Sequence, residues 1–376
     1  MSPWILLALA LPFEWKLEQT IAAGIVYRHA EYRDAAQGPF SIHVLEFDPK
    51  TPGIDLIAVR AEDKLAAKET VSSMAQRSGA LAAVNAGYFV VAGPLAGAPV
   101  SAYTLHGRLL SGSTTQVATG LPGAPLSGNP ERTAMVLCQT QGEEERIEMD
   151  IVRFRGEVSV GDRKRALDGL NRPRGDSGLV VYTRDIGPST RSGKDGVEAA
   201  LDRDGHVVRL EEGFGNVEIP EGGQVLSAAR EAADWIRANL RLGDVVKVNY
   251  GVERTGSGPA CAPSDLVAAG PRLVRSGEIV TASEGFRHET ARNPRTAIGV
   301  TASGSILLFV VDGRRADSVG MTIAELAQAM HALGAVDAMN LDGGGSTAMW
   351  VNGHVVNRPS DGRERAVSDG LVLRRR

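Results

Sequence analysis

The chain has 376 residues, of which 43% are hydrophobic and 23% charged. This composition is ordinary for a globular protein, and the length allows two domains or one large one. The formal net charge is -4, which excludes a typical nucleic-acid-binding protein with a basic stripe. An anionic substrate held by a few local arginines is compatible with this charge.

The N-terminus begins with an uncharged apolar run over residues 1–13. The run is too short to cross a bilayer, which needs about 20 residues, but it suits the hydrophobic part of a signal peptide. The basic residues that usually precede such a part are missing. We predict a signal peptide over 1–20 and a secreted or periplasmic, cell-envelope location, with a buried strand as the alternative. No later stretch is long and apolar enough for a membrane span.

The two cysteines, Cys138 and Cys261, form neither a CxxC pair nor a zinc-binding spacing. In an exported protein they could form one disulfide. Two separate buried thiols are the alternative.

Hydrophobic periodicity predicts many short strands and few helices along the chain. We expect helices at 70–78 and 228–240, and an Asp204-Gly205 hairpin turn between 198–201 and 207–210. Beyond the signal peptide, we predict a strand region over 21–80 and one elaborated domain over 81–376. The predicted fold class is α/β (α+β), a mixed multi-stranded sheet with flanking helices. Further strands are expected at 41–47, 54–59, 81–84, 179–182 and 245–250.

The last third predicts a strand–helix–strand–loop–hairpin unit. Strands at 296–300 and 306–311 precede a helix whose start is marked by a capping box, Thr322 with Glu325. Gly334 is predicted to end this helix, and a strand at 336–341 runs into a glycine-rich loop.

That loop, Asp342-Gly343-Gly344-Gly345-Ser346, is the first candidate site. Three consecutive glycines are entropically costly in a plain connector, but they let the backbone approach a ligand closely. Successive N–H groups can also form an anion-binding concavity. The loop is not a Walker A motif, because no lysine follows at the required spacing. A flexible linker with a turn-forming aspartate is the alternative.

Two arginines are candidates for binding an anion. Arg295 follows Pro294 and enters a strand together with Thr296, so its guanidinium sits on a fixed backbone suited to phosphate or carboxylate. Arg365 could supply a second cation. Ordinary surface salt bridges or turns are the alternatives.

Two more strand ends carry polar residues. Asp312 follows the apolar strand at 306–311 and is a second candidate acid or nucleophile, although a turn-forming Asp-Gly pair is the alternative. Asn85 ends the strand at 81–84 and, with Tyr88 and Phe89, could contact a sugar. Core aromatic residues beside a turn are the alternative.

Several familiar sites are missing from the sequence, namely the HExxH, GxSxG and GxGxxG motifs. The segment from Asp202 to Gly205 superficially resembles a calcium loop. Its glycine comes too early for an EF-hand, so we interpret it as a hairpin turn.

Taken together, the motifs resemble the phosphodiester glycosidase family. The similarity begins near Asn85, is dense after Arg292 and is specific because the motifs occur in family order. Ala86 departs from the polar or glycine residue that the family usually has there. The matching segments are 85–89 (NAGYF), 292–299 (RNPRTAIG), 311–314 (VDGR), 321–326 (MTIAEL), 340–346 (NLDGGGS), 351–353 (VNG), and 357–361 (NRPSD) with 365–367 (RAV).

The resemblance implies hydrolysis of the bond between the anomeric carbon of a sugar, such as N-acetylglucosamine, and a phosphodiester oxygen. The partner would be a small-molecule or glycan substrate that carries a phosphodiester. Asp342 and Asp312 are the predicted carboxylate pair, and their separation would distinguish retention from inversion. The predicted substrate contacts are Arg295, Arg365, Asn85, Thr296, Gly343, Gly344, Gly345 and Ser346.

Other functions remain open at this point. A non-catalytic module that binds phosphorylated cell-envelope glycans would use the same cationic clamp. Cleavage on the phosphorus side would leave a sugar phosphate. The sequence fixes no cofactor, although a divalent metal could lie near the aspartates.

Overall fold

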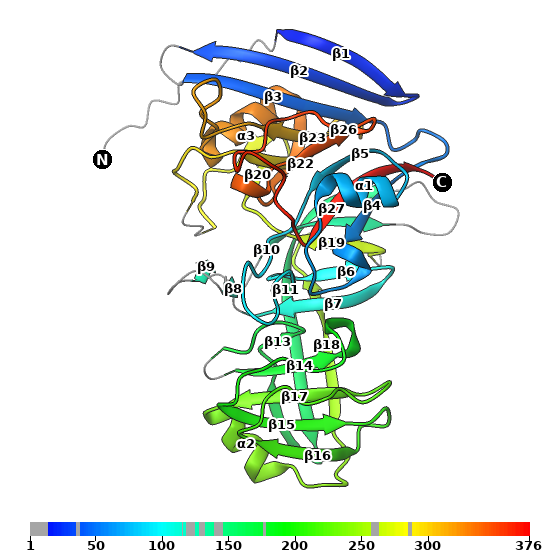
Figure 1. The fold of residues 1–376 in the computed structure, drawn as a ribbon, viewed down its shortest axis with the longest axis vertical. Helices are drawn as coiled ribbons and strands as arrows, with labels where there is room; N and C mark the ends of the chain where they lie inside the picture. Colours follow the sequence, from blue (N-terminus) through cyan, green and yellow to red (C-terminus); the bar gives the residue numbers. More distant parts are fainter. Residues whose placement is uncertain are drawn as a thin grey trace.

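Antiparallel sheets dominate the computed structural model, which describes residues 14–34, 38–114, 116–117, 125–127, 132–138, 146–175, 178–256, 263–284 and 288–376. The molecule is elongated, with a broad upper body and a narrower lower lobe (Figure 1). Among the described strands, β13 (Gly169–Leu170) and β14 (Leu179–Thr183) form the one parallel pair. The predicted fold class is therefore confirmed only in part: the protein is a single domain with flanking helices, but it is mostly β and divides its strands among several sheets.

An eight-stranded sheet crosses the top of the upper body, in the order β1-β2-β3-β23-β22-β24-β20-β21 (Figure 1). Side chains alternate between its two faces. Phe40, Ile42 and Val44 in β3 pack in one core with helix α3 (Ile323–Ala332), while Leu45 and Phe47 pack in the other. The strands are Trp15–Ala22, Ile25–Asp34, Gly38–Phe47, Ile306–Val311, Arg295–Thr301, Ala335–Asn340, Arg272–Arg275 and Glu278–Ile279.

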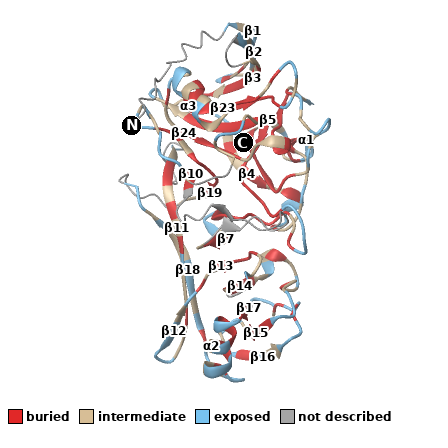
Figure 2. Cartoon of the chain, turned by 90° about the vertical axis from the view of Figure 1, so that its left-hand side faces the viewer, coloured by how far each residue is buried: buried red, intermediate tan, exposed pale blue. Residues whose placement is uncertain are grey.

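A five-stranded sheet, β26-β25-β5-β27-β4, packs beneath it and joins two strands from the first quarter of the chain, β4 and β5, to the last strand, β27. β5 is sandwiched between β25 and the last strand, β27, and helix α1 (Val71–Arg77) lies against them. Figure 2 shows that the buried residues concentrate in these sheets. The strands are His354–Val355, Met349–Val351, Ala80–Asn85, Asp369–Arg375 and Ile54–Arg60.

The lower lobe grows from one long strand, β11 (Arg146–Val160). Its first half pairs with β10 in the body, and its second half pairs with β18 and β12 in the lobe. Helix α2 (Glu231–Asn239) covers this end of the molecule. The other strands of this sheet are Tyr103–Leu105 (β6), Arg108–Ser113 (β7), Arg132–Cys138 (β10), Arg163–Ala166 (β12), Gly196–Leu201 (β15), Val207–Glu212 (β16), Gln224–Ala229 (β17), Lys247–Arg254 (β18) and Asp265–Ala268 (β19).

Short elements complete the chain. A two-stranded sheet joins β8 (Gln116–Val117) to β9 (Pro125–Ser127), and three 3₁₀ turns are described, η1 (Ala61–Asp63), η2 (Arg184–Ile186) and η3 (Gly344–Ser346). None of the helices in the described ranges has the length and hydrophobicity that a membrane crossing requires.

Local predictions hold best in the last third. Strands β22, β23 and β24, helix α3 and the β25–β26 hairpin all appear, and Thr322 and Glu325 form the expected capping box. The predicted 228–240 helix begins later than expected, because Ala228 and Ala229 still pair with β14 and β15. The predicted signal peptide, 1–20, falls mainly on residues outside the described part, and its end belongs to β1. Cys138 is disulfide-bonded, and Cys261 lies outside the described residues.

Candidate active site

A cavity of about 260 Å³ opens where β5, β22 and β24 end. Its lining combines a cationic side with an aromatic side. Among the described residues that line it, Asp342 is the one carboxylate. The lining residues are Tyr88, Phe89, Val91, His288, Asn293, Arg295, Arg314, Asp342, Gly343, Gly344, Ser346 and Arg365.

The glycine-rich loop forms one wall and leaves β24 as a 3₁₀ turn. Gly344 has φ +63°, a conformation that favours glycine, and a Cβ there would lie 2.9 Å from Nη2 of Arg314. A Cβ at Gly345 would lie 2.0 Å from Nη2 of Arg365. The glycines therefore allow two arginines to approach the loop backbone closely.

Three of the loop N–H groups that the sequence suggested as an anion cradle already have acceptors within the protein. Gly343 donates to the Asp342 carboxylate at 2.8 Å, Gly344 to the carbonyl of Pro294 at 2.8 Å, and Ser346 to the carbonyl of Gly343 at 3.2 Å. These donors are used inside the protein, so binding of an anion falls mainly to the side chains opposite.

Arg295 is the most rigidly held of these cations, with only 2% of its surface exposed. Nε donates to the carbonyl of Met321 at 2.8 Å, and Nη2 donates to the carbonyls of His288 and Ala291 at 2.8 and 2.7 Å. Burial lowers the pKa of Arg295 to about 10, so the guanidinium stays charged at neutral pH. Among the described residues, the hydrogen-bond partners of this guanidinium are neutral carbonyl groups, which favours an anionic ligand.

Arg314 and Arg365 extend the cationic side. Nη2 of Arg314 donates to the Asn293 side chain at 2.9 Å, and Arg365 forms an ion pair with Asp361 at 2.7 Å. Arg314 itself has φ +60°, a strained value for a non-glycine residue that points to a functional constraint.

The Asp342 carboxylate faces these cations. Burial raises the pKa of Asp342 to about 6, and this rise is opposed by hydrogen bonds from Ser346 and the Gly343 N–H and by the charge of Arg365. A carboxyl group poised near neutrality suits general base or nucleophilic chemistry.

His288 and Tyr88 close the cavity on another side. The Tyr88 hydroxyl donates to the carbonyl of Gly270 at 2.9 Å and lies 3.2 Å from Nε2 of His288. The Asn340 amide donates to the same hydroxyl at 2.9 Å. Burial, together with the charge of Arg295, lowers the pKa of His288 to about 4, so this imidazole is neutral at physiological pH.

Asn85 and Thr296 lie behind the cavity wall and are fully buried. The Asn85 amide donates to the Asp342 carbonyl at 2.6 Å, and its oxygen accepts from the Thr296 hydroxyl at 2.7 Å and from the Ala348 N–H at 3.1 Å. The direct sugar contact predicted for Asn85 is therefore wrong in this arrangement. Asn85 and Thr296 support the Asp342 loop instead.

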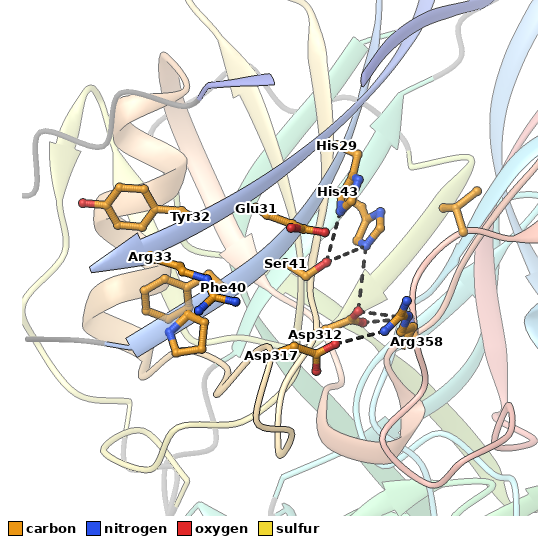
Figure 3. A pocket seen from close by; sticks show the side chains of 12 residues that line it. His29, Glu31, Tyr32, Arg33, Phe40, Ser41, His43, Asp312, Asp317 and Arg358 are labelled. Carbon is orange, nitrogen blue, oxygen red and sulfur yellow. Dashed lines mark hydrogen bonds and ion pairs between the residues drawn. The ribbon is translucent and has the colours of Figure 1, made fainter. Parts of the chain in front are cut away.

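Asp312 faces a different cavity of about 190 Å³ (Figure 3). Its carboxylate accepts from the Asn357 amide at 3.0 Å and from the backbone N–H of Arg358 at 2.9 and 3.1 Å. Nε2 of His43 lies 3.9 Å from Oδ2, and the Ser41 hydroxyl lies 3.2 Å from Nε2 of His29 and 3.4 Å from Nε2 of His43.

The alternation of a β-strand explains why Asp312 does not line the cavity of Asp342, as the predicted carboxylate pair would require. Arg295 pairs with Val311, so their side chains share one face of the sheet. Asp312 is the next residue and points to the opposite face. The distance between two carboxyl groups distinguishes retaining from inverting glycosidases. Among the described residues that line the Asp342 cavity there is one carboxylate, so this distance cannot be measured there.

A divalent metal does not fit the Asp342 cavity. Such ions prefer several oxygen ligands, whereas this cavity presents one carboxylate against three guanidiniums. The described part of the chain holds one group of three potential ligands, Asp202, Asp204 and His206, in the hairpin turn of the lower lobe. There Asp202 already accepts the N–H groups of Asp204 and His206 at 3.0 and 2.8 Å.

Sequence reasoning missed several lining residues. Arg314 lies in one of the motifs that resemble the family, but the sequence did not predict a role for it. His288 could not be predicted from neighbouring residues, because its position depends on contacts with Tyr88 and Arg295. Tyr88 and Phe89 were predicted as aromatic contacts and do line the cavity.

Comparison with known proteins shows the fold of the chain and a family that its C-terminal half resembles. The family model described as phosphodiester glycosidase matches residues 195–374. This C-terminal segment is similar to the phosphodiester glycosidase family. The match includes the strands and loops that carry Arg295, Arg314, Asp342 and Arg365, which confirms the resemblance seen in the sequence.

Individual relatives are similar to this chain over shorter segments. N-acetylglucosamine-1-phosphodiester alpha-N-acetylglucosaminidase of Mus musculus is 39% identical over 18% of this chain and 13% of its own length. The SPbeta prophage-derived uncharacterized protein YomE of Bacillus subtilis (strain 168) is 40% identical over 22% of this chain and 13% of its own length. The aligned segments thus span about an eighth of these relatives.

The whole fold has a solved counterpart. A Burkholderia pseudomallei protein thought to be exported superposes with a TM-score of 0.80, covering 96% of this chain and 97% of its own. The two sequences are 24% identical, so this likeness establishes the fold.

Proposed function

We propose that the Asp342 cavity hydrolyses the glycosidic bond of a sugar-1-phosphodiester, such as an N-acetylglucosamine-1-phosphodiester, and releases free sugar. The observation that carries this proposal is a single cavity in which three guanidiniums surround one carboxylate. The family match supports a glycosidase-type activity, and the name of the murine relative describes cleavage of this kind of bond.

Arg295, Arg314 and Arg365 would bind the diester anion and stabilise the charge that develops as the phosphate leaves. A phosphodiester is a good leaving group, so the reaction does not need a second carboxyl group as general acid. This chemistry agrees with a cavity that holds one carboxylate.

Asp342 would act at the anomeric carbon. As a general base it takes a proton from water while the water oxygen attacks, and the electron pair of the breaking bond stays on the phosphate oxygen. As a nucleophile it forms a glycosyl ester that water then hydrolyses. The aromatic wall of Tyr88 and Phe89 would pack against the sugar ring.

The test is incubation with a synthetic N-acetylglucosamine-1-phosphodiester in ¹⁸O-labelled water. The proposal expects free sugar that carries the label, with unlabelled phosphomonoester as the second product. Asp342→Asn should abolish release, whereas Asp234→Asn, an exposed carboxylate of α2, serves as the matched control.

Two other outcomes would favour the competing functions. A sugar phosphate that carries the label in its phosphate group, with the alcohol of the diester as the second product, would indicate cleavage on the phosphorus side. Tight binding of the diester with no product would indicate a binding module for phosphorylated cell-envelope glycans. Either result would overturn the glycosidase proposal.

We also propose that the protein works outside the cytoplasm, in a secreted or periplasmic location. The disulfide at Cys138 supports an oxidising compartment, and the Burkholderia counterpart is thought to be exported. Cell fractionation of the full chain checks this, and recovery from the cytoplasm alone would contradict it.

A further inference from the structure

A second buried carboxyl group, that of Asp369, lies behind the cavity wall. Asp369 begins β27 beside the end of β5, and it is 1% exposed. Its Oδ1 accepts the Gly87 N–H at 2.6 Å. Within the described residues Oδ2 makes no hydrogen bond of good geometry, although the Ser368 hydroxyl lies beside it.

One peptide unit connects Asp369 to Asp342. The N–H of Gly87 binds the Asp369 carboxyl, and the carbonyl at the other side of the same peptide, that of Ala86, accepts the Asp342 N–H at 2.8 Å. The Asn85 amide holds the Asp342 carbonyl at 2.6 Å. The backbone of Asp342 is thus anchored on a segment that Asp369 fixes from behind.

The contact between Asp369 and Gly87 is tight. A Cβ at Gly87 would lie 3.0 Å from Oδ2 and 3.4 Å from Oδ1 of Asp369, and 3.4 Å from Val267. The lack of a side chain at Gly87 therefore lets the carboxyl reach the backbone.

The surroundings favour a neutral carboxyl group. A buried carboxylate that accepts one N–H is poorly compensated, and such a group keeps its proton. Burial raises the pKa of Asp369 to about 7, and the charge of Asp342 adds to the rise. Tyr103 from β6 offers a buried hydroxyl without a described partner, near Asp369 and Asp265. Arg60 is the cross-strand neighbour in β4.

We propose that Asp369 is a positioning residue whose neutral carboxyl holds the Ala86–Gly87 peptide and, through it, the Asp342 loop. The inference rests on the proposed function for the identity of the site that is positioned. Loss of the proton places a second negative charge behind Asp342, so anion binding weakens as the pH rises through neutrality.

The test measures binding of dimethyl phosphate, whose charge is constant from about pH 5 to about pH 8, by calorimetry. Asp369→Asn presents an amide in place of the neutral acid, so it should bind like the native protein at the acidic end. Above neutrality the native protein should lose about tenfold more affinity than Asp369→Asn, the change that one pKa unit of coupling produces.

Asp369→Leu separates positioning from packing, because it fills the space but cannot accept the Gly87 N–H. It should remain folded by circular dichroism and lose dimethyl phosphate binding at every pH. The inference is overturned if Asp369→Leu binds as tightly as Asp369→Asn, or if Asp369→Asn shows the same pH dependence as the native protein.

Thermal melts across the same pH range give a readout that needs no ligand. The pKa of Asp369 in the folded protein is raised above the ordinary 3.8. The neutral carboxyl group therefore contributes stability at low pH, and this contribution is lost as the pH rises toward about 7. The melting temperature of Asp369→Asn should therefore rise relative to the native protein over that range, and parallel curves would contradict the inference. If the native protein released no sugar but the differences in binding and melting between it and Asp369→Asn were observed, the result would count against the proposed function and not against this inference.

Discussion

Asp342 and Asp312 have the same sequence signature and opposite environments. Each follows a buried strand and precedes glycine, yet Asp342 faces three arginines in one cavity, while Asp312 lies beside two histidines in another. The Asp312 carboxylate accepts three hydrogen bonds from the turn at Asn357 and Arg358. Asp342 accepts donors from its own loop and keeps a cationic cavity in front.

The difference shows that a strand end alone does not define a catalytic aspartate. The environment of such an aspartate depends on two things. One is the face of the sheet toward which its side chain points. The other is whether backbone and side-chain donors of the protein already bind its carboxylate. Asp312 accepts the N–H of Arg358 at the start of the segment that later carries Arg365, so we expect its contribution to the site to be structural.

The largest expected difference between the two aspartates is in turnover. Asp342→Asn removes the base or nucleophile and should lower kcat/KM by about 10³-fold or more. Asp312→Asn should lower it by about tenfold or less, through a shifted Arg365 segment. Sugar release measured for both variants, with Asp234→Asn as control, checks this. Equal losses would mean that the two carboxylates act as a pair after all.

Stability should reverse this order. Asp312→Asn keeps one acceptor oxygen but removes the negative charge that strengthens the hydrogen bonds from Asn357 and Arg358, which costs about 1–3 kcal/mol. Urea unfolding of the variant should show a lower midpoint with an unchanged slope. An unaltered midpoint would show that the turn at Asn357 does not depend on this carboxylate.

The sequence predicted both aspartates as catalytic candidates because it shows where the strands end. It does not show toward which cavity each side chain points. Thr322, Glu325 and Gly334 marked α3 through local chemistry, so that helix appears as expected. The long strand β11, which builds the lower lobe, carried no clear local signal. Its pairing with β10, β12 and β18 is a matter of long-range contacts.

The same limit applies to the site. Arg295 was identifiable because Pro294 restricts the preceding backbone and a strand follows. His288 and the role of Asp369 depend on burial and on partners more than a hundred residues away, such as Tyr88 and Gly87. No local pattern records those contacts.

A smaller effect concerns the cationic side alone. Arg314→Gln should weaken dimethyl phosphate binding by about 10- to 100-fold, the range for one charge-assisted hydrogen bond. Arg358→Gln, on the Asp312 cavity, is the matched control and should leave the affinity within about twofold. Calorimetry at two salt concentrations checks both variants, because the loss for Arg314→Gln should shrink at high ionic strength. Equal losses would mean that the two cavities share the anion.

The smallest predicted effect is a stability gain that accompanies the loss of activity. Burial raises the folded-state pKa of Asp342 from 3.8 to about 6, so ionising this group opposes folding. The stability associated with its neutral form is complete below about pH 4 and is lost as the pH rises through about 6. Asp342→Asn cannot ionise, so it should match the native protein at about pH 4 and exceed its stability by about 1–2 kcal/mol above pH 7, after allowance for exposure to the cavity. Thermal melts across this range measure the difference. If the ionised Asp342 carboxylate destabilises the fold, the melting temperatures of the native protein and Asp342→Asn should diverge as the pH rises. If the carboxylate instead stabilises the loop, Asp342→Asn should melt below the native protein at neutral pH.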